Sequence, residues 1–207
     1  LPVTLEDMDR ATAAVARSTS RAMIVADLPF GTYEDTVEHA FASATRLMKA
    51  GAHAVKLEGG QSRAHIIAGL VSAGIPVCAH LGYTPQSENT LGGPRMQGRG
   101  DDADALRRDA EAVEKAGAFA VVFEMVPASI ATELTQTLSI ATIGIGAGPH
   151  TDGQVLVWSD MAGYSDWTPS FVRKFGQLGP ALREAASDYV KAVRERSFPG
   201  PDNYKND

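Results

Sequence analysis

The sequence has very little cysteine. Its 207 residues include a single one, Cys78, so no disulfide can form within the chain. Cys78 lies inside an apolar stretch, and we expect a buried, inert thiol at this position. Chains without disulfides are typical of reducing compartments, which predicts a cytoplasmic location.

The sequence also lacks long apolar runs and clusters of basic residues. No stretch approaches the ~20 consecutive apolar residues that a membrane-spanning helix requires. The net charge is −6, and the lysines and arginines form no run, which argues against a nucleic-acid footprint. We therefore expect neither a membrane nor a nucleic acid as a partner.

Linker-like segments are missing as well. The chain length suits one domain with a sizeable core, and 44% of the residues are hydrophobic, as in ordinary globular proteins. We therefore predict a single domain over residues 1–207, in which residues 198–207 form a loose polar tail.

Short apolar segments alternate with longer amphipathic segments along the chain. This alternation predicts right-handed βαβ units and a parallel sheet that is buried on both faces. We expect strands at 22–26, 52–57, 75–79, 119–123, 140–145 and 155–158. We expect helices at 5–17, 35–49, 62–73, 101–115, 129–138 and 169–197.

Ionisable residues stand at the carboxyl ends of four predicted strands. They are Asp27, Glu58, His80 and Glu124. In parallel α/β folds these strand ends lie on one side of the sheet, where ligands bind. A single such residue more often caps a loop, but four that converge predict a functional site. Lys56 shares a strand face with Glu58; taken alone, this pair fits a solvated surface ion pair equally well.

Several longer motifs occur in a fixed order along the chain. They are Ala26-Asp27-Leu28-Pro29-Phe30, Val55-Lys56-Leu57-Glu58-Gly59-Gly60, His80-Leu81-Gly82-Tyr83-Thr84-Pro85-Gln86-Ser87, Gln97-Gly98-Arg99-Gly100, Glu124-Met125-Val126-Pro127, Gly144-Ile145-Gly146-Ala147-Gly148 and Thr151-Asp152-Gly153-Gln154. Through these motifs the sequence closely resembles the 3-methyl-2-oxobutanoate (ketopantoate) hydroxymethyltransferase family, from Leu1 to about Gly200.

The resemblance implies a fold, an activity and an assembly. The fold is a (β/α)8 TIM barrel of the phosphoenolpyruvate/pyruvate type. The activity is transfer of a hydroxymethyl group from 5,10-methylenetetrahydrofolate to 3-methyl-2-oxobutanoate, which gives 2-dehydropantoate in pantothenate biosynthesis. The assembly is a homo-oligomer, a decamer in well-known members.

The resemblance also implies roles for the strand-end residues. Asp27 and Glu58 look like Mg2+ ligands, and Asp27 and Lys56 look like contacts to the oxo acid. Glu124 looks like the catalytic proton acceptor, which removes the C3 proton of the substrate. Mg2+ suits one or two carboxylates plus substrate oxygens, and it would stabilise the enolate together with the Lys56 charge. His80 is expected to contact the substrate or, equally, to bond a neighbouring carboxylate.

One feature of the family is missing from this sequence. Family members carry two further βα units ahead of the segment that matches Leu1–Thr4, and the second supplies a Gly-Asp-Ser motif to the metal site. We therefore expect residues before Leu1, because six strands cannot close an eight-stranded barrel. Two alternatives stay open: another metal-dependent carbon–carbon bond enzyme acting on a 2-oxo acid, and a non-catalytic barrel fragment without the amino-terminal half-site.

Overall fold

The computed structural model describes residues 1–100 and 102–205. These residues form two compact units, Leu1–Val155 and Leu156–Asp207. The first unit contains the sheet and the helices that cover it, and the second contains the carboxyl-terminal helix. The organisation of the chain as one domain stays a prediction.

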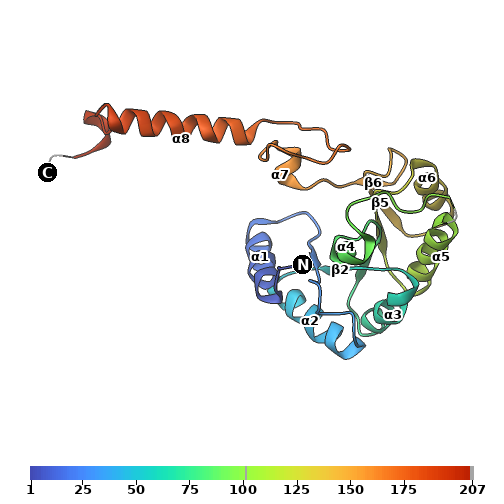
Figure 1. Cartoon of the computed structure of the whole chain (residues 1–207). Helices are drawn as coiled ribbons and strands as arrows, with labels where there is room; N and C mark the ends of the chain where they lie inside the picture. Colours follow the sequence, from blue (N-terminus) through green and yellow to red (C-terminus); the bar gives the residue numbers. More distant parts are fainter. Residues whose placement is uncertain (101, 206–207) are drawn as a thin grey trace. The chain divides into compact units, whose positions relative to one another are not determined.

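The first unit is built on a six-stranded parallel sheet (Figure 1). Each strand pairs with the next one along the chain, which is the order that successive βαβ units produce. This confirms the predicted α/β class, and the curved parallel sheet fits a TIM-barrel type. The strands are β1 (Val25–Asp27), β2 (Ala54–Glu58), β3 (Val77–Gly82), β4 (Ala120–Glu124), β5 (Ala141–Ile145) and β6 (Gly153–Gln154).

Helices cover the outer face of the sheet, in chain order around it (Figure 1). They are α1 (Leu5–Ser18), α2 (Val37–Ala50), α3 (Ala64–Ser72), α5 (Asp102–Lys115) and α6 (Ala128–Thr137), while the short α4 (Glu88–Leu91) lies in the loop after β3. A bilayer-crossing helix, which needs both length and a nearly uncharged apolar run, does not occur among the described residues.

Successive residues of each strand point to opposite faces of the sheet. On the outer face, Val55, Leu57 and Phe123 are fully buried in the main apolar core beneath the helices. On the inner face a much smaller apolar cluster contains Cys78 and Val122. Because strand side chains alternate between faces, the ionisable residues fall on this inner face, away from the helices.

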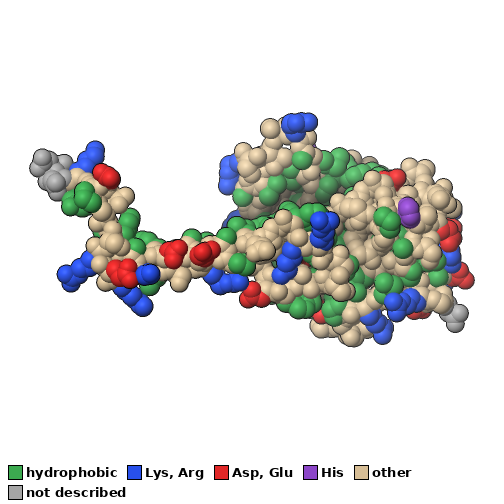
Figure 2. All heavy atoms as spheres, turned by 90° about the horizontal axis from the view of Figure 1, so that it is seen from above, with side chains coloured by type: hydrophobic (Ala, Val, Ile, Leu, Met, Phe, Trp, Pro, Cys, Tyr) green, Lys and Arg blue, Asp and Glu red, His purple; other side chains and the backbone are tan. Residues whose placement is uncertain are grey.

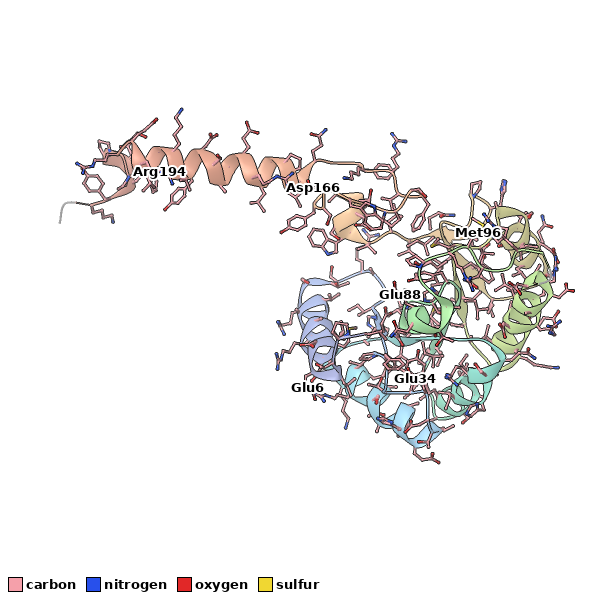
Figure 3. The ribbon with its side chains drawn as sticks, viewed as in Figure 1. Glu6, Glu34, Glu88, Met96, Asp166 and Arg194 are labelled. Atoms are coloured by element: carbon pink, nitrogen blue, oxygen red, sulfur yellow. The ribbon has the colours of Figure 1, made fainter. Side chains whose placement is uncertain are left out.

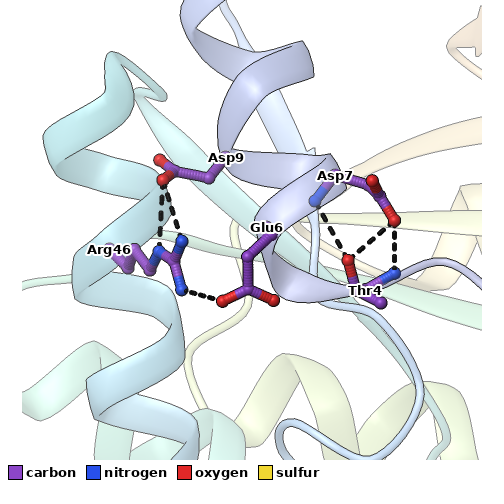
Figure 4. Close-up of polar contacts among 5 residues, drawn as sticks. All are labelled: Thr4, Glu6, Asp7, Asp9 and Arg46. Carbon is purple, nitrogen blue, oxygen red and sulfur yellow. Dashed lines mark hydrogen bonds and ion pairs between the residues drawn. The ribbon is translucent and has the colours of Figure 1, made fainter.

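The first helix is fixed at its start and along its side. The Thr4 hydroxyl accepts a hydrogen bond from the Asp7 N–H, and the Asp7 carboxylate accepts one from the Thr4 N–H, which forms a capping box. Arg46 of α2 contacts Glu6 at 2.7 Å and Asp9 at 3.1 Å, so α1 and α2 are joined by a charge cluster (Figure 4).

The end of the sheet differs from the prediction. A strand at 155–158 is wrong, because β6 is Gly153–Gln154 and a short helix, α7 (Trp158–Met161), begins at Trp158. The physical reason is a side chain: the Asp152 carboxylate accepts hydrogen bonds from the Thr142 N–H at 2.8 Å and hydroxyl at 2.9 Å. This contact brings the next two residues alongside β5.

Within the described residues, β1 and β6 form the two edges of the sheet. Ring closure between these two strands is therefore not observed there. The presence of two further strands, expected from the resemblance, stays a prediction.

The second unit contains α7 and α8 (Leu178–Arg194), whereas the sequence predicts a helix over 169–197. The residues just before Leu178 are not helical but are bonded to the end of α7. The N–H groups of Phe175 and Leu178 donate to the carbonyls of Met161 and Ala162. In Figure 2 exposed apolar side chains alternate with charged ones along α8. The exposed apolar side chains of α8 are Leu178, Leu182, Tyr189, Val190 and Val193.

Candidate active site

The candidate site lies at the carboxyl ends of β1 to β4. Strand register places Asp27 opposite Lys56 and Glu58 opposite His80. Glu124 is opposite Gly82, which is two residues beyond His80. All of these side chains therefore project from the same face of the sheet, as their strand-end positions predict.

Lys56 and Asp27 form the first contact of the site. The Lys56 ammonium lies 3.1 Å from Asp27 Oδ2. The Lys56 side chain is only 18% exposed, whereas that of Asp27 is 48% exposed. The lysine is thus held largely out of solvent with its charge at the rim, while the aspartate stays accessible to a ligand.

His80 lies between two carboxylates. Its Nδ1 is 3.4 Å from Glu58 Oε1, and its Nε2 is 3.2 Å from Glu124 Oε2. Burial opposes the charged imidazolium, but the carboxylates of Glu124 and Glu58 outweigh this effect and raise the pKa of His80. A protonated His80 therefore offsets the negative charge of the two glutamates.

The contacts of His80 are charge pairs rather than aligned hydrogen bonds. Both ring nitrogens are buried and lack a hydrogen-bond partner of good geometry among the described residues. Buried polar atoms are normally satisfied, and an exception at a site indicates a group that a ligand or water completes. The imidazole therefore lies buried between Glu58 and Glu124 with neither ring nitrogen in an aligned hydrogen bond.

The backbone around Glu124 is closely constrained. The Tyr83 N–H donates to the Glu124 carbonyl at 2.8 Å. Gly82 has φ +92°, and a Cβ there would collide with the Glu124 carbonyl, so only glycine allows this approach. Met125, the next residue, has φ 50°, an unusual value for a non-glycine residue that often marks functional sites.

Two loop residues that the sequence reasoning missed contact Glu58. The Gln86 N–H donates to Glu58 Oε2 at 2.9 Å, and the Glu58 N–H donates to the Tyr33 hydroxyl at 3.2 Å. In Figure 3, Glu34 marks the loop after β1 that contains Tyr33, and Glu88 marks the segment after β3 that contains Gln86. Both residues lie in loops, where the sequence has no helical or strand periodicity to indicate them. Gln86 does belong to one of the motifs noted above.

A small cavity adjoins the exposed side of Asp27. Its volume is about 150 Å3. It is lined mainly by apolar side chains, namely Leu1, Val3, Met8, Pro29 and Phe30, together with Asp27 and Gln86. An apolar cavity with a carboxylate and an amide in its lining can hold a small molecule that has one polar and one alkyl end.

Cys78 lies on the same face of the sheet, opposite Lys56 in the strand register. Burial raises the pKa of its thiol to about 11. The thiol is therefore un-ionised at neutral pH, and its burial agrees with the buried position expected from the sequence.

The donor set of the site suits Mg2+. Asp27 and Glu58 supply hard carboxylate oxygens, and the Asp27 carboxylate is accessible. A cluster of three or more potential protein ligands of the His, Cys, Asp or Glu type is not found in residues 1–100 and 102–205. Mg2+ typically binds through one or two carboxylates and keeps water or substrate oxygens as its other ligands, so the two carboxylates fit.

The chain resembles known proteins over nearly its whole length. A family model described as ketopantoate hydroxymethyltransferase matches residues 1–201. The 3-methyl-2-oxobutanoate hydroxymethyltransferase of Rhodococcus jostii is 56% identical over 205 residues, which cover 98% of this chain and 71% of that protein. The protein of the same name from Corynebacterium efficiens is 55% identical over 202 residues, which cover 97% and 75%.

Two solved structures of other enzymes have a similar fold. Phosphonopyruvate hydrolase, in complex with oxalate and Mg2+, is 13% identical with a TM-score of 0.56, and the match covers 98% of this chain and 74% of that one. 2,3-Dimethylmalate lyase, a member of the PEP mutase/isocitrate lyase superfamily, is 16% identical with a TM-score of 0.56, over 96% and 70%. At these identities the likeness concerns the fold alone.

Proposed function

The chain belongs to the ketopantoate hydroxymethyltransferase family of enzymes, and we propose that it transfers a hydroxymethyl group from 5,10-methylenetetrahydrofolate to 3-methyl-2-oxobutanoate. The product is 2-dehydropantoate, in the pathway to pantothenate. The observation that carries this proposal is the convergence of a cation, an accessible carboxylate and a candidate base on one sheet face.

Asp27 and Glu58 hold Mg2+ in this proposal. When bound, the metal polarises the keto oxygen and stabilises negative charge that develops there. Lys56 contacts the oxo acid with its ammonium group, which lies beside Asp27. Because Lys56 is largely buried, its charge acts in a low-dielectric setting, where it counts for more than at a surface.

Glu124 is the proton acceptor. Its carboxylate takes the C3 proton of the substrate, and the C–H electron pair moves towards the keto group. Water adds to the one-carbon unit carried by the folate and its carbon–nitrogen bonds break, so that tetrahydrofolate leaves. C3 then forms a bond to this carbon, now at the oxidation level of formaldehyde, and its oxygen takes the proton held by Glu124 to become the hydroxyl group. His80 contacts both the Glu124 carboxylate and the substrate, since its buried nitrogens still lack aligned partners.

We also propose that the protein is a homo-oligomer. The proposal rests on the family, whose well-known members form decamers. Sedimentation velocity of the full chain measures this directly, and a protein that sediments as a monomer over the micromolar range would contradict it.

Product analysis tests the proposed reaction. The full chain is incubated with Mg2+, 5,10-methylenetetrahydrofolate and 3-methyl-2-oxobutanoate, and 2-dehydropantoate is quantified by NMR. Pyruvate and 2-oxobutanoate serve as competing 2-oxo acids, since an enzyme of different specificity would prefer one of them. We expect measurable hydroxymethyl transfer to 3-methyl-2-oxobutanoate and none to pyruvate or 2-oxobutanoate. Turnover of a different acid, with none of the branched one, would refute the substrate assignment.

A further inference from the structure

A closed circuit of hydrogen bonds begins and ends at Glu58. The Glu58 N–H donates to the Tyr33 hydroxyl at 3.2 Å, and that hydroxyl donates to Gln86 Oε1 at 2.7 Å. The Gln86 N–H then donates to Glu58 Oε2 at 2.9 Å. The same two residues therefore fix both the backbone and the carboxylate of Glu58.

Gln86 also reaches β1. Its side-chain Nε2 donates to the Leu28 carbonyl at 2.9 Å, and Leu28 directly follows Asp27. The Leu28 N–H donates in turn to the Lys56 carbonyl at 2.8 Å, which continues the pairing of β1 with β2. Gln86 is thus bonded to the Glu58 carboxylate on one side and to the residue after Asp27 on the other.

Donor and acceptor chemistry permits only one arrangement of this circuit. The Leu28 carbonyl can only accept, so the amide nitrogen of Gln86 must face it and the amide oxygen must face Tyr33. The single hydroxyl proton of Tyr33 is then used for Gln86. Tyr33 is 1% exposed, so water does not compete for its hydroxyl group. The Tyr33 hydroxyl is bonded on both sides, to the Glu58 N–H and to Gln86 Oε1, and a satisfied buried group of this kind restrains its partners.

We propose that Gln86 and Tyr33 are positioning residues that set the spacing of the Asp27 and Glu58 carboxylates for Mg2+. This inference rests on the proposed function, in which those two carboxylates hold the metal. Mg2+ requires nearly octahedral ligands at about 2.0–2.1 Å, whereas Ca2+ accepts longer and less regular contacts. A spacing held by the circuit therefore favours Mg2+ over Ca2+, and a loosened spacing removes that preference.

Calorimetric titration of the full chain without substrate tests the inference. Gln86→Met keeps the side-chain length and the backbone N–H, but loses the two hydrogen bonds of the side-chain amide. Tyr33→Phe removes the hydroxyl alone. We expect each variant to bind Mg2+ roughly tenfold or more weakly, the range typical when a partner of a metal ligand is removed. Ca2+ affinity should change much less, so the Mg2+/Ca2+ affinity ratio falls.

Gln136→Met and Tyr189→Phe are matched controls, since both side chains are exposed and distant in sequence from the circuit. They should keep the parental ratio. Circular dichroism establishes that each variant is folded, and if Gln86→Met is not, Tyr33→Phe decides the matter alone. If the folded Gln86→Met and Tyr33→Phe variants keep the parental Mg2+/Ca2+ affinity ratio, or lose affinity for both cations equally, the inference is overturned. The proposed reaction is left standing in either case. A parent that binds no Mg2+ overturns both.

Discussion

His80 and the four charged residues around it illustrate what single positions reveal. Asp27, Lys56, Glu58, His80 and Glu124 were predictable as neighbours because each stands at or near the end of a parallel strand, and such ends meet at one edge. Their pairwise contacts were not predictable, because these depend on strand register: Glu58 lies opposite His80, whereas Glu124 lies two residues further along.

Tyr33 and Gln86 illustrate what the sequence hides. Both lie in loops, where neither the helical nor the strand period applies, and they meet across 53 residues of chain. Only the folded chain brings the loop after β1 beside the loop after β3. Residues that hold a functional side chain through one hydrogen bond therefore need a structure to be found.

Replacing Lys56 tests the role of the buried cation. Lys56→Met keeps most of the aliphatic stem and removes the charge beside Asp27. We expect kcat/KM for 3-methyl-2-oxobutanoate to fall roughly a hundredfold, the scale for losing one charge-stabilising group. Both KM and kcat should change, because the ammonium meets the oxo acid in the ground state and the transition state. Steady-state kinetics measures this, and Lys49→Met, at an exposed position, is the control. Parental kinetics in Lys56→Met would show that Lys56 does not act in the site.

At the scale of elements, local signals and tertiary contacts determine different boundaries. The helices α1, α2 and α5 lie close to their predicted ranges, because capping residues and glycines define their ends. β6 and the start of α8 do not, since side-chain and backbone bonds to β5 and α7 override the local pattern there.

The capping box of α1 makes a measurable contribution to stability. Thr4→Ala removes the hydroxyl that accepts from the Asp7 N–H. We expect the free energy of unfolding to fall by about 1 kcal/mol, the usual effect of losing such a cap. Urea unfolding followed by circular dichroism measures the change. Ser20→Ala, an exposed loop hydroxyl, should leave the midpoint unaltered, and equal effects of the two substitutions would contradict the cap assignment.

Asp152 makes the pairing of β5 with β6 sensitive to pH. Hydrogen bonds from the Thr142 N–H and hydroxyl lower the pKa of Asp152 in the folded protein. A folded-state pKa below the unfolded value means that the carboxylate stabilises the fold above about pH 4, and that this stabilisation is lost as pH falls through the folded pKa.

Asp152→Asn should therefore be less stable than the parent at neutral pH. The difference should shrink as the pH falls below about 4, because the parental carboxylate is then protonated as well. Thermal unfolding recorded from about pH 2 to pH 7 compares the two melting temperatures. A difference that stays constant over this range would show that the charge of Asp152 plays no part.

At the scale of the whole molecule, the sheet has two faces with different tasks. Its outer face packs against the helices and forms a large apolar core with them. Its inner face carries the charged groups and only a small apolar cluster. This division was predictable in outline, since alternating strands and helices imply a buried parallel sheet with its site at the strand ends. The arrangement of residues 156–205 was not, because it depends on close backbone contacts near glycines such as Gly163 and Gly179.

Proton exchange at C3 of 3-methyl-2-oxobutanoate tests the central claim most directly. The full chain is incubated with this acid and Mg2+ in D2O, without folate, and loss of the C3 proton signal is followed by NMR. The account predicts enzyme-dependent exchange by the parent, loss of exchange when the metal is chelated, and at least a hundredfold slower exchange by Glu124→Gln, which retains substrate binding. Exchange by Glu124→Gln at the parental rate, or no exchange by the parent, would contradict it.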